Sequence, residues 1–118
     1  MATGDLIWTG ETRNGVRIAG AAGRVDEANA VAFLDRLNSE VDLASGDGVK
    51  RLVVDLSEIE YMSSRGLRGL TLAQRKAGEA GIAIVLARPN EIMVEILAIS
   101  RYDKVFQVFE SIEATIET

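Results

Sequence analysis

Two short, continuous apolar runs constrain the fold of this chain more than any other feature. The first is Leu52-Val53-Val54, followed by Leu56, and the second is Ile82–Ala87. Runs of this length without polar alternation are typical of strands buried on both faces of a parallel sheet. The residues between them have helical periodicity, and a helix is the usual connection between parallel strands. The sequence therefore predicts strands at Arg51–Leu56 and Ile82–Ala87 in an α/β fold.

A β-hairpin is expected at the start of the chain. Asn14-Gly15, the strongest two-residue hairpin signal, separates the expected strands Leu6–Arg13 and Val16–Ala21. After the hairpin we expect a helix over Glu27–Glu40, a loop over Ser57–Met62 and a helix from Ser63 or Ser64 to about Gly78–Gly81. A third helix is expected over Glu91–Ile99, followed by an edge strand over Lys104–Val108 and a last helix capped by Ser111. The apolar residues of the third helix expected to face inward are Ile92, Met93, Ile96, Leu97 and Ile99. Together these elements predict a mixed sheet of four to five strands with an initial β-hairpin and about four helices packed on it, in a single domain over residues 1–118.

The amino-acid composition excludes several classes of function, although it says little about the fold. The chain has no Cys and no His, which excludes disulfides, a Ser-His-Asp triad and imidazole or thiolate metal sites, and argues against an enzyme. Its net charge of −5 argues against nucleic acid as a partner. No apolar run is long enough to insert into a membrane, and the N-terminus lacks a signal pattern, so the expected location is the cytoplasm. There is no glycine-rich phosphate loop, and no cofactor is expected.

The segment from Val53 to Lys76 resembles the STAS domain, in particular the bacterial anti-sigma factor antagonists. The residues that carry this resemblance are Asp55-Leu56-Ser57, Tyr61-Met62, Ser63-Ser64 and Gly66-Leu67. Gly23-Arg24-Val25-Asp26 is similar to the second recurring motif of that family, which precedes the first helix. The expected order of elements matches the family over nearly the whole chain.

The resemblance implies a switch controlled by serine phosphorylation. An unphosphorylated antagonist of this family binds an anti-sigma factor that is also a serine kinase of the GHKL type, and so frees a sigma factor or another output. The kinase phosphorylates one serine at the start of the second helix, the complex dissociates, and a PP2C-like phosphatase resets it. Ser64 takes the position of the phospho-acceptor, with Ser63 as second choice, and Arg65 stands where a small residue is common. From the residues alone, either serine could simply be an N-cap.

Several residues are expected to contact the partner. On a helical wheel Arg65, Arg68, Leu72 and Arg75 share the outward face of the second helix, which places Leu72 in solvent among cations. Two interpretations remain open: a solvated basic face with one exposed Leu, or a contact surface with a hydrophobic anchor. The full expected set is Arg24, Asp26, Met62, Ser63, Arg65, Arg68, Leu72 and Arg75, with Asp26 also predicted to be the N-cap of the first helix.

Two further interpretations stay open. Stand-alone STAS proteins also serve as subunits of membrane lipid ABC transporters, where they bind the ATPase and need no phosphorylation. In addition, the carboxylates of Asp55, Glu58 and Glu60 could hold a cation, although a solvated loop is the simpler interpretation.

Overall fold

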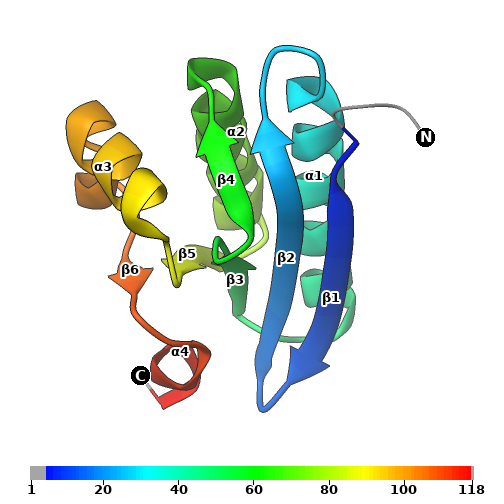
Figure 1. The fold of residues 1–118 in the computed structure, drawn as a ribbon. Helices are drawn as coiled ribbons and strands as arrows, with labels where there is room; N and C mark the ends of the chain where they lie inside the picture. Colours follow the sequence, from blue (N-terminus) through cyan, green and yellow to red (C-terminus); the bar gives the residue numbers. More distant parts are fainter. Residues whose placement is uncertain (1–4, 118) are drawn as a thin grey trace.

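The computed structural model describes residues 5–117, and within this range the chain forms a mixed α/β fold around one six-stranded sheet. The elements in chain order are β1 (Ile7–Arg13), β2 (Val16–Val25), α1 (Ala30–Gly46), β3 (Arg51–Asp55), β4 (Ile59–Met62), α2 (Ser64–Glu79), β5 (Ala83–Ala87), α3 (Glu91–Ser100), the 3-10 turn η1 (Tyr102–Lys104), β6 (Val108–Phe109) and α4 (Ile112–Glu117) (Figure 1).

The sheet has the order β1-β2-β3-β5-β6, with β4 paired to β2. Only β1 and β2 are antiparallel among the described strands, and the other pairs are parallel. Asn14 and Gly15, which join β1 to β2, have φ values of 50° and 86°. Positive φ at both central residues is the pattern of a type I′ turn, so the predicted hairpin is confirmed. The expected fold class is confirmed as well, although the sheet has six strands instead of the four to five predicted.

The second strand, β2, is long enough to pair with two other strands along the same edge. Its segment Arg17–Gly20 pairs with β3, whereas Gly23–Val25 pairs with β4. The sequence prediction ended this strand at Ala21 and treated residues 57–62 as a loop, and both statements are wrong. The consequence is that β2 and β4 run side by side and end together at the same end of the molecule (Figure 1).

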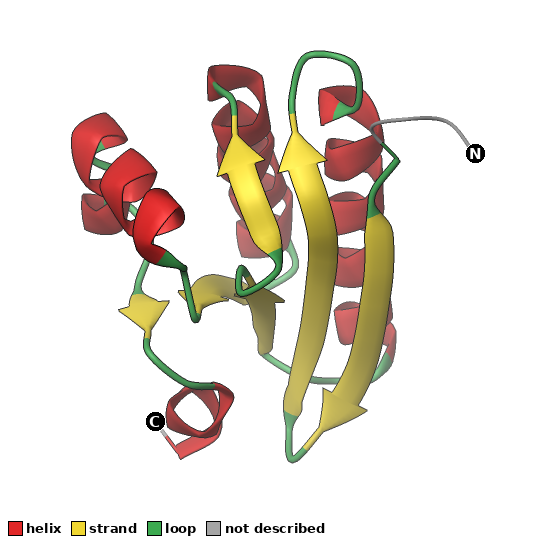
Figure 2. Cartoon of the chain, viewed as in Figure 1, coloured by secondary structure: helices red, strands yellow, loops and turns green. Residues whose placement is uncertain are grey.

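Helices cover both faces of the sheet. The main core lies between the sheet and α1, α2 and α3, and includes Phe33, Leu37, Leu70 and Met93. Figure 2 shows α1 and α2 side by side behind the strands. A smaller cluster on the opposite face joins α4 to the middle of the sheet and contains Ile112 of α4 together with Val53 and Val85.

Three predicted helix and strand positions need correction. Helix α1 begins at Ala30 rather than Glu27, and it continues to Gly46 because Val41 and Ala44 extend its buried stripe. The edge strand expected at Lys104–Val108 is displaced: Tyr102–Lys104 form η1, and the strand β6 begins at Val108.

The third helix, α3, buries fewer of its apolar side chains than predicted. Met93 and Leu97 are buried, but Ile92 and Ile99 are exposed by 52% and 83%. Both were expected to face inward, and this expectation is wrong. The narrow apolar stripe that contains Met93 and Leu97 is enough to pack α3 against the core. The expected cap of α4 is confirmed, since Ser111 Oγ accepts a hydrogen bond from the amide of Ala114 at 3.1 Å.

Candidate functional site

The two candidate serines lie where β4 passes into α2. The amide of Ser63 donates to the carbonyl of Val25 at 2.8 Å, which ties the end of β4 to the end of β2. In open sheets with parallel strands, binding sites usually lie beyond the carboxyl ends of the strands. The start of α2 and the loop between β2 and α1 meet at that end, which is the upper end in Figure 1.

Ser63 and Ser64 have different structural roles. Ser63 is the N-cap residue: its Oγ accepts a hydrogen bond from the amide of Gly66 at 3.2 Å, and the residue is only 7% exposed. Ser64 is the first residue of α2 and is exposed. Because Ser63 is occupied in capping the helix and shielded from solvent, Ser64 is the hydroxyl that an enzyme can reach.

The loop from β2 to α1 is held by Asn29, which the sequence analysis did not single out. Asn29 Oδ1 accepts from the amide of Asp26 at 2.9 Å, and Asn29 Nδ2 donates to the carbonyl of Arg24 at 2.8 Å. Asp26 Oδ1 accepts from the amide of Ala28 at 3.0 Å. Asp26 therefore supports the loop, and its prediction as the N-cap of α1 is wrong, since that position belongs to Asn29. An Asn directly before the apolar stripe was the available signal.

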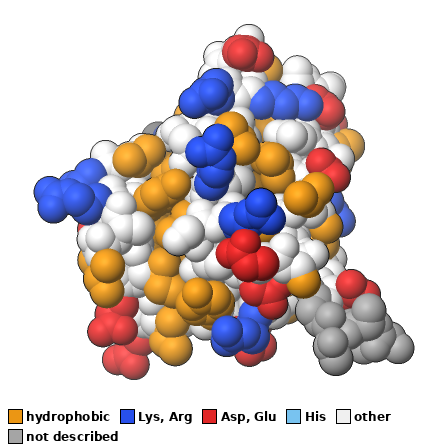
Figure 3. Space-filling view, turned by 90° about the horizontal axis from the view of Figure 1, so that it is seen from above, with side chains coloured by type: hydrophobic (Ala, Val, Ile, Leu, Met, Phe, Trp, Pro, Cys, Tyr) orange, Lys and Arg blue, Asp and Glu red, His pale blue; other side chains and the backbone are white. Residues whose placement is uncertain are grey.

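Three exposed arginines lie at the end of the sheet where α2 begins. The guanidinium of Arg24 lies 4.6 Å from the ring centroid of Tyr61, its neighbour across the β2–β4 pair, which is within the range of a cation–π contact. Arg65 forms an ion pair with Glu27 at 3.2 Å, and Arg68 is exposed one turn further along α2. Seen from above, this end shows Lys and Arg side chains among apolar and acidic ones (Figure 3). Because Arg24, Arg65 and Arg68 are exposed here, a negatively charged surface could dock against this end.

With this geometry in place, comparison with known proteins identifies the family. The family model described as the STAS domain matches residues 8–115. The chain belongs to the STAS domain family. BtrV of Bordetella bronchiseptica, provisionally named an anti-sigma factor antagonist, is 33% identical over 101 residues, which cover 86% of this STAS domain chain and 84% of BtrV. RsfB of Mycobacterium tuberculosis, named an anti-sigma-F factor antagonist, is 28% identical over 99 residues, or 84% of this chain and 77% of RsfB.

Solved structures show the same fold. The crystal structure of an anti-sigma factor antagonist from Mycobacterium paratuberculosis has a TM-score of 0.78 at 22% identity, covering 98% of this STAS domain chain and 95% of the other. The anti-sigma factor antagonist SpoIIAA in its unphosphorylated form has a TM-score of 0.72 at 12% identity and 94% coverage of both chains. SpoIIAA from Bacillus has also been solved in its phosphorylated form, with a TM-score of 0.63 at 14% identity, covering 94% of this chain and 97% of that one.

Three residues expected on the partner surface of the STAS domain occupy other places. Met62 is 2% exposed and packs in the core, so its side chain is not available to a partner. Ser63 is buried as the cap of α2, so it is not a partner contact either. Leu72 was expected in solvent, but it is half-buried and lines a groove between α1 and α2. The helical wheel of α2 assumed that α2 packs only against the sheet. In the structure α1 also packs against α2 and covers a second side of that helix. Arg75 is exposed, as expected.

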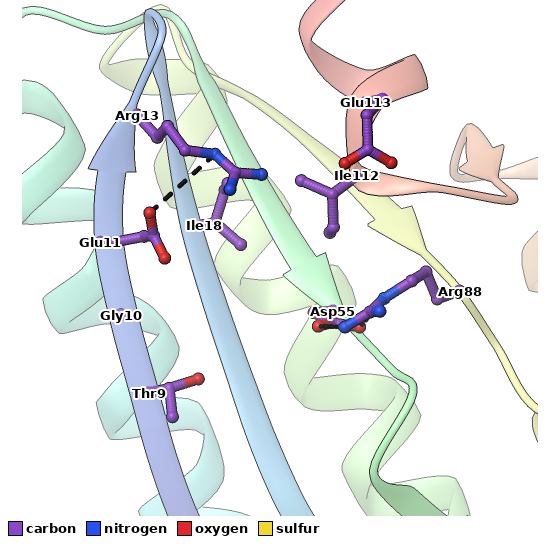
Figure 4. A pocket seen from close by; sticks show the side chains of 9 residues that line it. All are labelled: Thr9, Gly10, Glu11, Arg13, Ile18, Asp55, Arg88, Ile112 and Glu113. Atoms are coloured by element: carbon purple, nitrogen blue, oxygen red, sulfur yellow. Dashed lines mark hydrogen bonds and ion pairs between the residues drawn. The ribbon is translucent and has the colours of Figure 1, made fainter.

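Asp55, at the end of β3, is bound to an arginine. Its carboxylate accepts two hydrogen bonds from Arg88, at 2.6 Å from Nη2 and 3.2 Å from Nε. The pair borders a cavity of about 340 Å³ between β1 and α4, shown in Figure 4, where Arg13 lies near Glu11 at 3.9 Å. No group of acidic residues suited to a metal ion is present in the described part of the chain. The cation site considered for Asp55, Glu58 and Glu60 therefore has no support.

The Asp55–Arg88 pair predicts a pH-dependent contribution to stability. Partial burial by itself raises the pKa of Asp55, but hydrogen bonds from Arg88 and Ser57 outweigh it, so the pKa lies below its usual value. A carboxyl with a lowered pKa in the folded state stabilises the fold above its unfolded pKa of about 3.9, and loses this contribution as pH falls through the folded value. We expect Asp55→Asn to be less stable than wild type at pH 7, and this difference to shrink below about pH 4.

Urea unfolding followed by the fluorescence of Trp8, the single tryptophan, measures this difference at each pH. Glu58→Gln is the matched control, because Glu58 is exposed and close in sequence to Asp55. It should change stability by less than about 0.5 kcal/mol. A difference between Asp55→Asn and wild type that stays constant from pH 7 to pH 3 would show that the pair does not act as described.

No helix in the described part of this STAS domain is both long and apolar enough to cross a membrane.

Proposed function

We propose that this STAS domain is an anti-sigma factor antagonist whose binding is controlled by phosphorylation of Ser64. In its unphosphorylated form it binds an anti-sigma factor that is also a serine kinase of the GHKL type, and thereby frees a sigma factor or another output. The kinase phosphorylates Ser64 and the complex dissociates. A PP2C-like phosphatase then restores the binding form. The domain acts through binding and carries no catalytic group of its own in this scheme.

The observation that carries the proposal is the contrast between the two adjacent serines. Ser63 is buried and caps α2, whereas Ser64 is exposed at the first position of the helix. In this proposal the two serines have separate roles: Ser63 fixes the start of α2, and Ser64 presents its hydroxyl to the kinase.

The position of Ser64 also suits a bound phosphate. The first amides of a helix lack partners within the helix and carry the positive end of its dipole, which favours negative charge there. A phosphoserine adds a charge of about −1.5 to −2. At this place it adds charge and bulk to the surface while leaving the helix intact. This suits a modification that has to break one interface without unfolding the protein.

The relatives support the same role. RsfB is named an anti-sigma-F factor antagonist, and BtrV carries a provisional name of that kind. SpoIIAA, which shares the fold, is known in an unphosphorylated and a phosphorylated form. Two states of a protein with this fold are in keeping with a switch that works by a local change of charge.

We expect kinase and ATP to modify Ser64 and no other serine. The GHKL-type serine kinases of the same organism are each incubated with the protein and Mg·ATP, and mass spectrometry maps the phosphate. Ser64→Ala should abolish incorporation yet keep the affinity for the kinase, because the unmodified surface is preserved. Ser64→Asp should weaken binding, because it adds a negative charge at the interface. Calorimetry measures both affinities.

Ser63→Ala is the control that separates the two serines. It should still accept phosphate on Ser64, while losing about 1 kcal/mol of stability with its cap. Phosphate found on Ser63 alone would contradict the assignment. So would equal affinity of wild type, Ser64→Ala and Ser64→Asp for a kinase that modifies the protein, because the serine would then not control this interface.

A further inference from the structure

A small apolar groove lies between the start of α1 and the first half of α2, and its lining on α2 begins at Arg65, directly after Ser64. Its floor is formed by Ala30 and Leu34 of α1 and by Gly69 and Leu72 of α2, and Val31 forms one wall. Gly69 has no side chain to occupy this part of the space between the two helices, which leaves a depression there. A Cβ atom at Gly69 would lie 3.5 Å from the ring of Phe33 and 3.7 Å from Leu34 Cβ, which is ordinary contact without a clash.

The groove has the size of one aliphatic side chain. Its volume is about 110 Å³. An apolar cavity of about 150 Å³ is known to hold benzene, so the groove takes a slightly smaller group, such as the branched end of a leucine. Val31, at the edge of the groove, is 67% exposed. Burial of such an aliphatic side chain by a partner would lower the free energy of the complex. The groove is therefore an apolar surface that a partner can cover with a single anchoring residue.

The charge at the rim identifies the kind of partner. Arg65 and Arg68 border the groove on a protein with a net charge of −5. Arg65 pairs with Glu27, whereas Arg68 has no carboxylate partner among the side chains of residues 5–116. A cation left unpaired in a mostly acidic molecule favours an acidic group on the protein that docks there.

We propose that this groove receives a leucine-like side chain of the anti-sigma factor, flanked by carboxylates that pair with Arg68 and Arg65. The inference rests on the proposed function and specifies how its binding surface works. It also reverses the sequence-based interpretation, because the hydrophobic anchor comes from the partner, and Leu72 forms part of its receptor.

The same arrangement explains how a phosphate on Ser64 acts. Ser64 and Arg68 are four residues apart, so they are neighbours on one face of α2. A phosphate on Ser64 lies within reach of Arg68 and competes for the cation that the partner's carboxylate uses. It also repels that carboxylate directly. The modification therefore removes the electrostatic part of the interface and leaves the apolar groove in place.

The first test uses two small peptides, acetyl-Glu-Leu-Glu amide and acetyl-Lys-Leu-Lys amide, titrated into the full chain and followed by amide NMR. The acidic peptide should shift the signals of Val31, Gly69 and Leu72, and should bind about tenfold more tightly than the basic one. Arg68→Glu should remove this preference. Equal binding of the two peptides, or shifts confined to other parts of the chain, would overturn the proposal.

The second test fills the groove. Gly69→Ala places a methyl group on its floor without a clash and should weaken binding of the acidic peptide by about tenfold, an effect of about 1.4 kcal/mol. Gly78→Ala is the matched control, since Gly78 lies in the same helix with open space around it. Both variants should melt no lower than wild type, because Ala favours a helix over Gly. Unchanged peptide affinity in a folded Gly69→Ala variant would contradict the assignment of the groove.

A kinase that phosphorylates Ser64 separates this inference from the proposed function. If Gly69→Ala and Arg68→Glu both weaken kinase binding, the groove belongs to the interface. If Ser64 is phosphorylated and both variants bind the kinase like wild type, the proposed function holds and the groove is not used. If no GHKL-type kinase binds or modifies the wild type, the proposed function fails whatever the peptides show.

Discussion

Glu40→Ala is expected to destabilise the protein by about 3–5 kcal/mol, the largest loss we expect from a single substitution. Glu40 is fully buried, and its carboxylate accepts from Arg17 Nε at 2.7 Å and from Arg36 Nε at 3.0 Å. The side chain of Arg17 is only 13% exposed. Removal of Glu40 leaves this guanidinium buried without its counter-charge, which costs more than the loss of the ion pair itself. Urea unfolding followed by Trp8 fluorescence measures the change.

Two controls define what that measurement means. Asp35→Ala removes an exposed acidic residue from the same helix and should cost less than about 0.5 kcal/mol. The double variant Arg17→Met, Glu40→Met removes both buried charges. It should recover most of the stability, because the charge that then lacks its partner, that of Arg36, is 37% exposed. A loss of less than about 1 kcal/mol in Glu40→Ala would show that water reaches Arg17 readily, and that the pair contributes little.

The main elements of the fold could be predicted because their signals are local. Asn14-Gly15 requires positive φ at both residues and therefore places the hairpin. The apolar runs in β3 and β5 and the start of α2 at Ser64 follow from burial and capping within a few residues. Patterns of this kind need no knowledge of what packs against them.

The missed features depend on distant partners. Strand β4 has only four residues, and it is a strand because β2 extends far enough to pair with it. Leu72 was placed in solvent because the sequence does not show that α1 packs beside α2. Gly69 carries no side chain and left no signal on the wheel, yet its missing side chain opens the groove. The position of Ser64 could thus be predicted, whereas the shape of the surface beside it could not.

Gly66→Ala is expected to destabilise the protein by about 1–3 kcal/mol, although alanine is the better helix former. A Cβ atom at Gly66 would lie 2.6 Å from Met62 Cγ and 2.6 Å from Val25 Cγ1. Val25 is β-branched and fully buried, so it cannot turn away. The clash is therefore relieved by moving the start of α2 away from β2 and β4. Urea unfolding measures the loss of stability.

Gly78→Ala, the same substitution in the same helix, should have the opposite sign and stabilise by about 0.4–1 kcal/mol, because nothing lies within 4 Å of its new methyl group. The comparison isolates packing from helix propensity. Since the amide of Gly66 donates to the cap Ser63, displacement of α2 in Gly66→Ala also moves Ser64. We therefore expect slower phosphorylation of Ser64 in Gly66→Ala and an unchanged rate in Gly78→Ala. If both variants are stabilised alike, the close approach of α2 to β2 does not exist, and the small residue at position 66 is not what sets Ser64 in place.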